Sequence, residues 1–128
     1  MRSVEEEYWS RGLHDATIED IQCGELTPDY KEKNYRYNYL QVTVDAADAI
    51  YDTTVKEIIF YNYTAERNGE RIHDLSRYVG CWWLGDHLEK KAHKYVLQLK
   101  LRSIPKHGKP INETLTIKFE QLKVIREE

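Results

Sequence analysis

The sequence has few cysteines, glycines and prolines, so it has little material for disulfides, cysteine-based metal sites or glycine-rich nucleotide-binding loops. Its 128 residues include two cysteines, six glycines and three prolines. Cys23 and Cys81 lie far apart and belong to no Cys-x-x-Cys pair, so we expect two reduced thiols, with a disulfide as the alternative. No glycine-rich phosphate-binding motif is present, and we therefore expect no cofactor.

Long apolar runs and a strong charge of one sign are also missing. No stretch approaches the ~20 apolar residues of a membrane helix, and three consecutive glutamates at positions 5–7 replace the apolar core of a secretory signal. The formal net charge is −3, from 19 basic and 22 acidic residues, so no overall positive field attracts nucleic acid. These absences predict a cytoplasmic protein that binds neither membranes nor nucleic acid.

The composition is typical of one folded domain. Hydrophobic residues make up 41% of the chain and charged residues 32%, a mixture found in soluble globular proteins. A chain of this size buries about two thirds of its extended surface on folding, which gives a core without a metal or a disulfide. We predict a single domain over residues 1–128.

Alternation of apolar and polar residues with a period of two is the clearest pattern in the chain. It runs through residues 40–44, 93–102 and 115–119, each of which is predicted to be a strand. After residue 119 the apolar residues change parity, which indicates a bulge. Segment 55–63 is rich in β-branched and aromatic residues, and we expect a central strand buried on both faces.

The remaining segments complete a β-rich prediction. Residues 14–23 are expected to form a strand with a bulge near Asp20, and residues 79–88 another strand. Asn68-Gly69 predicts a tight turn. Residues 89–91 are expected to form a solvated turn, and residues 72–78 are expected to form either a strand or a short helix. Ser3 and Glu6 have the spacing of a capping box, which predicts a short N-terminal helix. With no βαβ alternation, the prediction is a mainly β, antiparallel sandwich or partly open barrel of five to seven strands.

Three histidine–aspartate neighbours are the first candidates for chemistry. They are His14-Asp15, His73-Asp74 and Asp86-His87. Imidazole and carboxylate groups are common ligands of divalent metals, so His14, His73 and His87 are candidate ligands for a metal-dependent hydrolase. Adjacent residues on a strand point to opposite faces, however, and the alternative is that these residues cap turns and strand ends. No metal spacing and no nucleophile motif support catalysis, so we assign no catalytic residue.

Aromatic residues give the main indication of a binding surface. Tyr37 and Tyr39 lie opposite the apolar face of their strand, and Tyr61 lies on a strand that follows. Such rows stack sugars, bases or a partner's apolar side chains. The alternative is that tyrosine stabilises the sheet through cross-strand pairs.

A second aromatic candidate is the pair Trp82-Trp83. Two neighbours on a strand face opposite sides, so one indole is expected in the core and the other near the surface. We predict that the outer tryptophan, with Asp86 and His87 after it, forms a recognition spot.

The opening Tyr8-Trp9, followed by Leu13-His14-Asp15-Ala16, resembles that of short bacterial β-proteins of unknown function. In those proteins an aromatic–His–Asp stretch leads into the first strand, a later strand resembles residues 58–62, and a tryptophan-containing segment precedes a final aliphatic strand. Some of them look like immunity partners that block a toxin. The resemblance implies a cytosolic bacterial protein and transfers no catalytic residue.

Three functions follow as hypotheses. The first is a non-enzymatic module that binds another protein, in the manner of an immunity protein. The second is a small-molecule or carbohydrate binder that uses the tyrosine-rich sheet face, and the third is the metal-dependent hydrolase. Because open antiparallel sheets leave unpaired edges, a homodimer is a further prediction.

Overall fold

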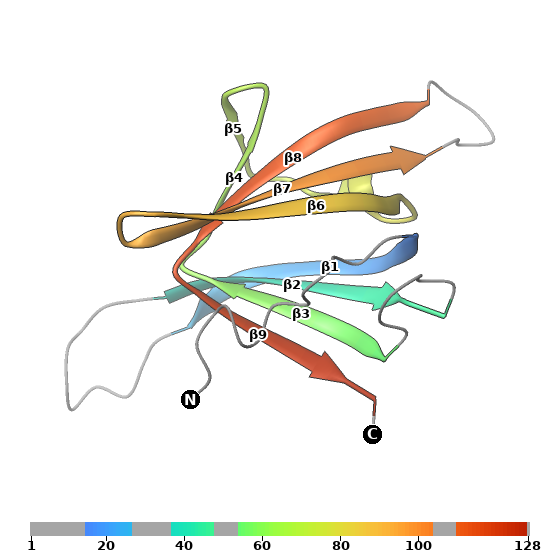
Figure 1. Cartoon of the computed structure of the whole chain (residues 1–128), viewed down its shortest axis with the longest axis horizontal. Coiled ribbons are helices and arrows are strands. Elements are labelled where there is room, and N and C mark those ends of the chain that lie inside the picture. The colour runs from blue at the N-terminus through green and yellow to red at the C-terminus, as the bar shows by residue number, and fades with distance from the viewer. Residues whose placement is uncertain (1–14, 27–36, 48–53, 104–109, 128) are drawn as a thin grey trace.

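The computed structural model describes residues 15–26, 37–47, 54–103 and 110–127. These residues form one antiparallel sheet of nine strands in the order β5-β4-β8-β7-β6-β1-β2-β3-β9 (Figure 1). The strands are β1 (Ala16–Leu26), β2 (Tyr37–Asp45), β3 (Val55–Tyr61), β4 (Thr64–Arg67), β5 (Glu70–Ile72), β6 (Trp82–Lys91), β7 (Lys94–Ser103), β8 (Ile111–Phe119) and β9 (Gln121–Arg126). One 3-10 turn, η1 (Ser76–Tyr78), precedes β6. No helix in these ranges has the length and apolar character needed to cross a membrane.

Two bends fold the sheet over on itself. Only Asn62 and Tyr63 separate β3 from β4, and only Glu120 separates β8 from β9. β3 pairs with β9 on one side of the bends, and β4 pairs with β8 on the other. In Figure 1, β6, β7 and β8 therefore lie above β1, β2, β3 and β9.

The core is built from the inward residues of both parts of the folded sheet. Alternate residues of β2, β7 and β8 are buried, as the period-two pattern predicts. Phe60 and Phe119 meet edge to face, with ring centroids 5.0 Å apart, and Tyr95 stacks on Phe119 with centroids 5.7 Å apart. These aromatic contacts join β3, β7 and β8 around the bends.

The structure confirms the mainly β, antiparallel prediction and the bulge in the first strand. Register shifts between Ile18 and Asp20, where the sequence places that bulge. The Asn68-Gly69 turn is also confirmed, because φ is +53° at Asn68 and +80° at Gly69, as a two-residue hairpin turn requires. The undecided segment 72–78 contains the end of β5 and the turn η1.

Several finer predictions are corrected. The described residues form nine strands, more than the predicted five to seven, because the bends divide two long strands and a short β5 follows the Asn68-Gly69 turn. Segment 55–61 is not buried on both faces, since its alternate residues are partly or fully exposed. Residues 89–91 are the end of β6, and the chain turns at Ala92 and His93. The parity change after residue 119 is a bend at Glu120, where β8 ends and β9 begins. The predicted N-terminal helix lies outside the described residues.

Candidate functional site

Trp82 and Trp83 face opposite sides of the sheet, as the sequence predicts. Trp83 is fully buried, whereas 46% of Trp82 is exposed. Trp82 and Val79 are the exposed large hydrophobic residues of the described ranges; Trp82 begins β6, and Val79 follows η1 three positions earlier. The sheet therefore presents an indole to solvent.

The register of β6, β7 and β8 shows what surrounds Trp82. Trp82 is paired with Thr17 of β1 and with Arg102 of β7, and Arg102 is paired with Asn112 of β8. In the next row, Gly85 is paired with Lys100, and a side chain added at Gly85 would meet no atom within 4 Å. We call this outward surface the Trp82 face and define it by Trp82, Gly85, His87, Lys100, Arg102, Asn112 and Thr114.

The other two members of the predicted recognition spot separate across the sheet. Asp86 is paired with the buried Leu99, and its Oδ2 atom accepts a hydrogen bond of 2.8 Å from the Nε1 atom of Trp83. The Asp86 carboxylate therefore binds the buried indole of Trp83 and does not lie on the side of the sheet that carries Trp82. His87 is exposed and lies on the outward side, where its Nε2 atom is 3.1 Å from Oε1 of Glu89.

The tyrosines predicted as a binding row are engaged with their neighbours in the sheet. Tyr39 is paired with Gly24 on one side and with Tyr61 on the other. A Cβ atom at Gly24 would lie 2.8 Å from Cε1 of Tyr39, so the ring lies over the glycine. Tyr39 thus makes the cross-strand contact of the alternative interpretation. Tyr37 begins β2, and its side chain lies outside the described atoms.

The histidines predicted as metal ligands do not gather in the described part of the chain. There, no three His, Cys, Asp or Glu side chains come close enough to hold an ion. His73 and His87 are exposed, and His14 lies outside the described residues. Asp74 caps a turn instead, because its Oδ1 atom accepts a 2.9 Å hydrogen bond from the N–H of Ser76. Hydrogen bonds from Ser76 hold the pKa of the Asp74 carboxyl below its usual value.

Both cysteines are free, and they differ in exposure. Cys81 is buried, and burial raises the pKa of its thiol. Its Sγ atom lies 4.0 Å from the carbonyl oxygen of Arg77. Cys23 is exposed and lies on β1 next to Tyr63. The two thiols therefore form no disulfide.

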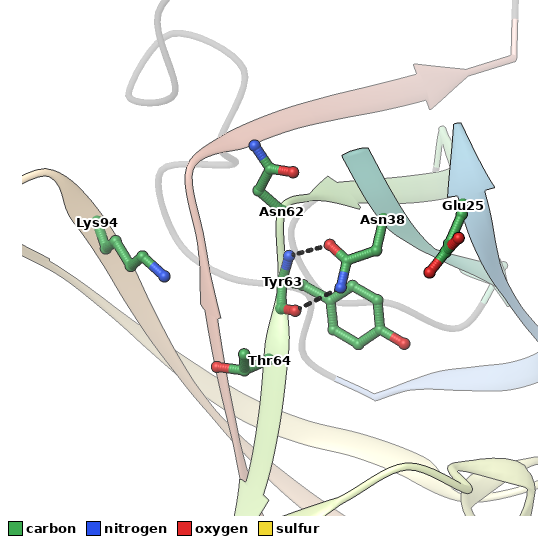
Figure 2. Close-up of a pocket in the computed structure, with 6 residues that line it drawn as sticks. All are labelled: Glu25, Asn38, Asn62, Tyr63, Thr64 and Lys94. Atoms are coloured by element: carbon green, nitrogen blue, oxygen red, sulfur yellow. Dashed lines mark hydrogen bonds between the residues drawn. The ribbon is translucent and has the colours of Figure 1, made fainter. Parts of the chain in front are cut away.

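A polar pocket lies where the chain bends between β3 and β4 (Figure 2). We call it the corner pocket; its volume is about 330 Å³, and its lining residues are Glu25, Asn38, Asn62, Tyr63, Thr64 and Lys94. Asn38 braces the bend, because its Nδ2 donates to the carbonyl of Tyr63 at 2.9 Å and its Oδ1 accepts from the N–H of Tyr63 at 2.8 Å. Asn62 has a φ of +53°, a conformation that asparagine adopts more readily than most residues.

Tyr63 forms an uncharged wall beside the pocket. Burial raises the pKa of its phenol to about 12, and the neighbouring Cys23 adds to the rise. The phenol is therefore protonated at neutral pH. Sequence analysis did not select the corner pocket, because its residues come from four strands whose pairing the sequence does not show.

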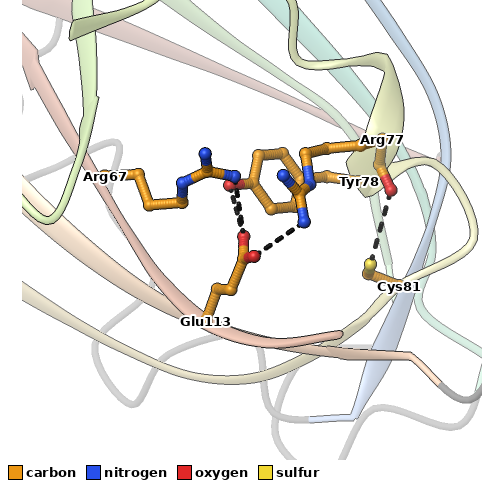
Figure 3. A network of polar contacts seen from close by, with 5 residues as sticks. All are labelled: Arg67, Arg77, Tyr78, Cys81 and Glu113. Atoms are coloured by element: carbon orange, nitrogen blue, oxygen red, sulfur yellow. Dashed lines mark hydrogen bonds and ion pairs between the residues drawn. The ribbon is translucent and has the colours of Figure 1, made fainter. Parts of the chain in front are cut away.

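A second polar cluster joins η1 to β4 and β8 (Figure 3). We call it the Glu113 cluster. The carboxylate of Glu113 lies 2.7 Å from Nη2 of Arg77 and 3.6 Å from Nη1 of Arg67, and it accepts a 2.8 Å hydrogen bond from the hydroxyl of Tyr78. Burial and, to a lesser extent, the Glu113 carboxylate raise the pKa of Tyr78 to about 12. These groups bind one another, so the cluster fastens η1 to the sheet.

Comparisons with known proteins give no relative for this arrangement. No protein-family model, curated protein or solved structure matches the chain.

Proposed function

We propose that this protein is a non-enzymatic binding module that recognises another protein through the Trp82 face. The observation that carries the proposal is the 46% exposure of Trp82 in a rigid strand of a well-packed sheet. Tryptophan is among the residues most enriched at the energetic centres of protein interfaces, and a fixed indole loses little conformational entropy on binding.

The charges around Trp82 indicate the kind of partner surface. Lys100 and Arg102 lie in the rows of Trp82 and Gly85, whereas the carboxylate of Glu89 lies beside His87, farther along β6. Complementary charge steers association and disfavours like-charged partners. The bound surface is therefore an acidic one with an apolar pocket for the indole. An immunity-type role, in which the chain blocks a toxin, is one form of this proposal.

Two further parts of the proposal concern architecture and location. We infer that the folded sheet amounts to a partly open barrel, since strand pairing continues across both bends. A cytoplasmic location is supported by the two free thiols, one of them exposed, which suit a reducing compartment.

The proposal is tested by capture with immobilised protein from an extract of the source cells. We expect one specific partner to be retained by the wild type and to lose at least tenfold in affinity with Trp82→Ala or Arg102→Glu. Lys123→Ala is the matched control, because Lys123 is also an exposed strand residue but lies on β9, at the edge of the sheet, and is not part of the Trp82 face. Unfolding in urea verifies that all variants are folded. The proposal is contradicted if the partner binds both variants as tightly as the wild type, or if no protein is retained at all.

The predicted homodimer is a separate question. The sheet order places β5 and β9 at its two ends, each with one strand neighbour among the described strands. Sedimentation equilibrium over a hundredfold range of concentration distinguishes a monomer from a dimer.

A further inference from the structure

The corner pocket has the features of a ligand site that is independent of the Trp82 face. It lies at the end of the sheet where β7 begins, whereas Trp82 begins β6 at the other end of the same hairpin. Eight positions of β7 separate Lys94 from Arg102, which corresponds to roughly 26 Å at the rise of a strand. No residue that lines the pocket belongs to the Trp82 face.

The wall of the corner pocket is held in place before any ligand arrives. The two hydrogen bonds between Asn38 and the backbone of Tyr63 fix the bend. The N–H of Asn62 donates to the carbonyl of Asn38 at 2.9 Å, and the Nδ2 atom of Asn62 donates to Oε2 of Glu120 at 2.9 Å. A rigid polar wall reduces the entropy that a ligand loses on binding.

The two charged groups lie at opposite ends of the corner pocket. Figure 2 shows Lys94 reaching toward the bend from one side and Glu25 lying on the other, with Asn62, Tyr63 and Thr64 between them. Lys94 forms no ion pair with another described residue, and its side chain is exposed. An anionic group is therefore favoured near Lys94 and disfavoured near Glu25, where hydrogen-bond donors are favoured instead.

We propose that the corner pocket binds a monosaccharide that carries a carboxylate, such as a hexuronic acid. The carboxylate lies against Lys94 and Thr64, and the hydroxyl groups donate toward Glu25 and the carbonyl oxygen of the Asn62 amide. A volume of about 330 Å³ accommodates one sugar ring. The Tyr63 ring supplies an uncharged aromatic wall, which suits the apolar face of a sugar.

The test compares three sugars that differ in one substituent. Glucuronate, glucose and 6-amino-6-deoxyglucose, which differ only in the group at carbon 6, are each titrated into ¹⁵N-labelled full-length protein, and amide shifts are followed by NMR. We expect glucuronate to bind with a dissociation constant of about 1 mM, the range expected of a ligand of this size in an open site. Glucose binds more weakly, and 6-amino-6-deoxyglucose is the weakest because its ammonium takes the place of the carboxylate and faces Lys94. The shifts centre on the amides of Asn62, Tyr63 and Thr64.

Lys94→Ala and Lys91→Ala form a matched pair of variants. Both lysines are exposed and are paired with each other across the β6–β7 hairpin, but Lys91 does not line the pocket. We expect Lys94→Ala to weaken glucuronate binding roughly threefold to tenfold and to leave glucose unchanged, since one exposed charge-assisted contact is removed. Lys91→Ala leaves both affinities as in the wild type.

Four results overturn the proposal. The first three are the absence of localised shifts with glucuronate, equal affinity for all three sugars, and equal effects of the two lysine variants. A preference for glucuronate that persists in Lys94→Ala also overturns it, because the carboxylate then binds elsewhere. None of these results depends on whether the Trp82 face binds a protein.

Discussion

The two ends of the folded sheet are fixed by different kinds of polar contact. At the corner pocket, the neutral side chain of Asn38 bonds to the backbone of Tyr63 with both of its polar atoms. At the opposite end, the charged Glu113 collects two guanidinium groups and a phenol. Neutral groups hold Tyr63 at the first end, where the Glu120 carboxylate adds one acceptor for Asn62, and charged groups dominate the second end.

This difference determines how each end responds to change. The two Asn38 side-chain bonds come from one amide, so a single substitution removes both. The Glu113 contacts are distributed over three partners, and water replaces part of what a single substitution removes because the cluster is partly exposed. We therefore expect the loss of one polar side chain to have a larger effect at the first end than at the second.

The largest expected effect belongs to the buried tryptophan near the Glu113 end. Trp83→Ala is expected to lower the free energy of unfolding by about 3–5 kcal/mol, because it leaves a cavity and removes the donor to Asp86. Trp82→Ala, its neighbour in sequence, should change that free energy by less than about 0.5 kcal/mol. Urea unfolding monitored by circular dichroism measures both. Comparable losses would show that Trp82 is part of the packing and does not form a free surface.

Asn38→Ala tests the neutral end. It leaves the N–H and the carbonyl of Tyr63 without their side-chain partner, and we expect the free energy of unfolding to fall by about 2–3 kcal/mol. Asn112→Ala is the control, since Asn112 is exposed on β8 and should cost less than about 0.5 kcal/mol. Equal losses in the free energy of unfolding for the two variants would show that the Asn38 bonds do not stabilise the bend.

Local pattern predicted the strands and much of the core. Alternation identified β2, β7 and β8, and the rule that neighbours on a strand face opposite sides assigned different environments to Trp82 and Trp83. The bend at Glu120 was not predicted, because a parity change looks the same for a bulge and for a bend. The bend at Asn62-Tyr63 was not predicted, because residues 55–63 were expected to form one continuous strand.

The candidate sites were less accessible to sequence analysis than the strands. Glu113 and Arg77 are 36 positions apart, and Asn38 and Tyr63 are 25 apart, so only the strand order brings them together. Asp86 was placed beside the outer tryptophan because the bulge between Trp83 and Gly85 could not be foreseen. That bulge turns Asp86 to the side of Trp83.

Tyr78→Phe tests the charged end. The substitution removes the hydroxyl that donates to Glu113 and keeps the ring in the core. We expect the free energy of unfolding to fall by about 1–2 kcal/mol, since the carboxylate keeps Arg77 and contact with water. Tyr61→Phe is the control and should have no measurable effect. A loss as large as that of Asn38→Ala would mean that the Glu113 cluster is as dependent on one residue as the bend.

The smallest expected effect is a change in the free energy of unfolding that appears only in alkaline solution. It arises from one phenol at each end of the sheet, Tyr63 and Tyr78. The pKa of Tyr63 and that of Tyr78 are both raised from 10.0 to about 12. Between pH 10 and pH 12 the unfolded chain therefore loses these protons while the folded chain retains them. Since the folded state then binds more protons, its stabilisation by these groups is complete below pH 10 and is lost as the pH rises toward 12.

The titrations of the two phenols can be distinguished because Tyr63 and Tyr78 have different neighbours. Glu113→Gln removes a charge beside Tyr78 but not beside Tyr63, so it should lower the pKa of Tyr78 and leave that of Tyr63 near 12. Absorbance at the tyrosinate band, compared among the wild type, Tyr63→Phe, Tyr78→Phe and Glu113→Gln, assigns each titration. If Glu113→Gln leaves the pKa of Tyr78 unchanged, burial alone accounts for the rise, and the charged end then behaves like the neutral one.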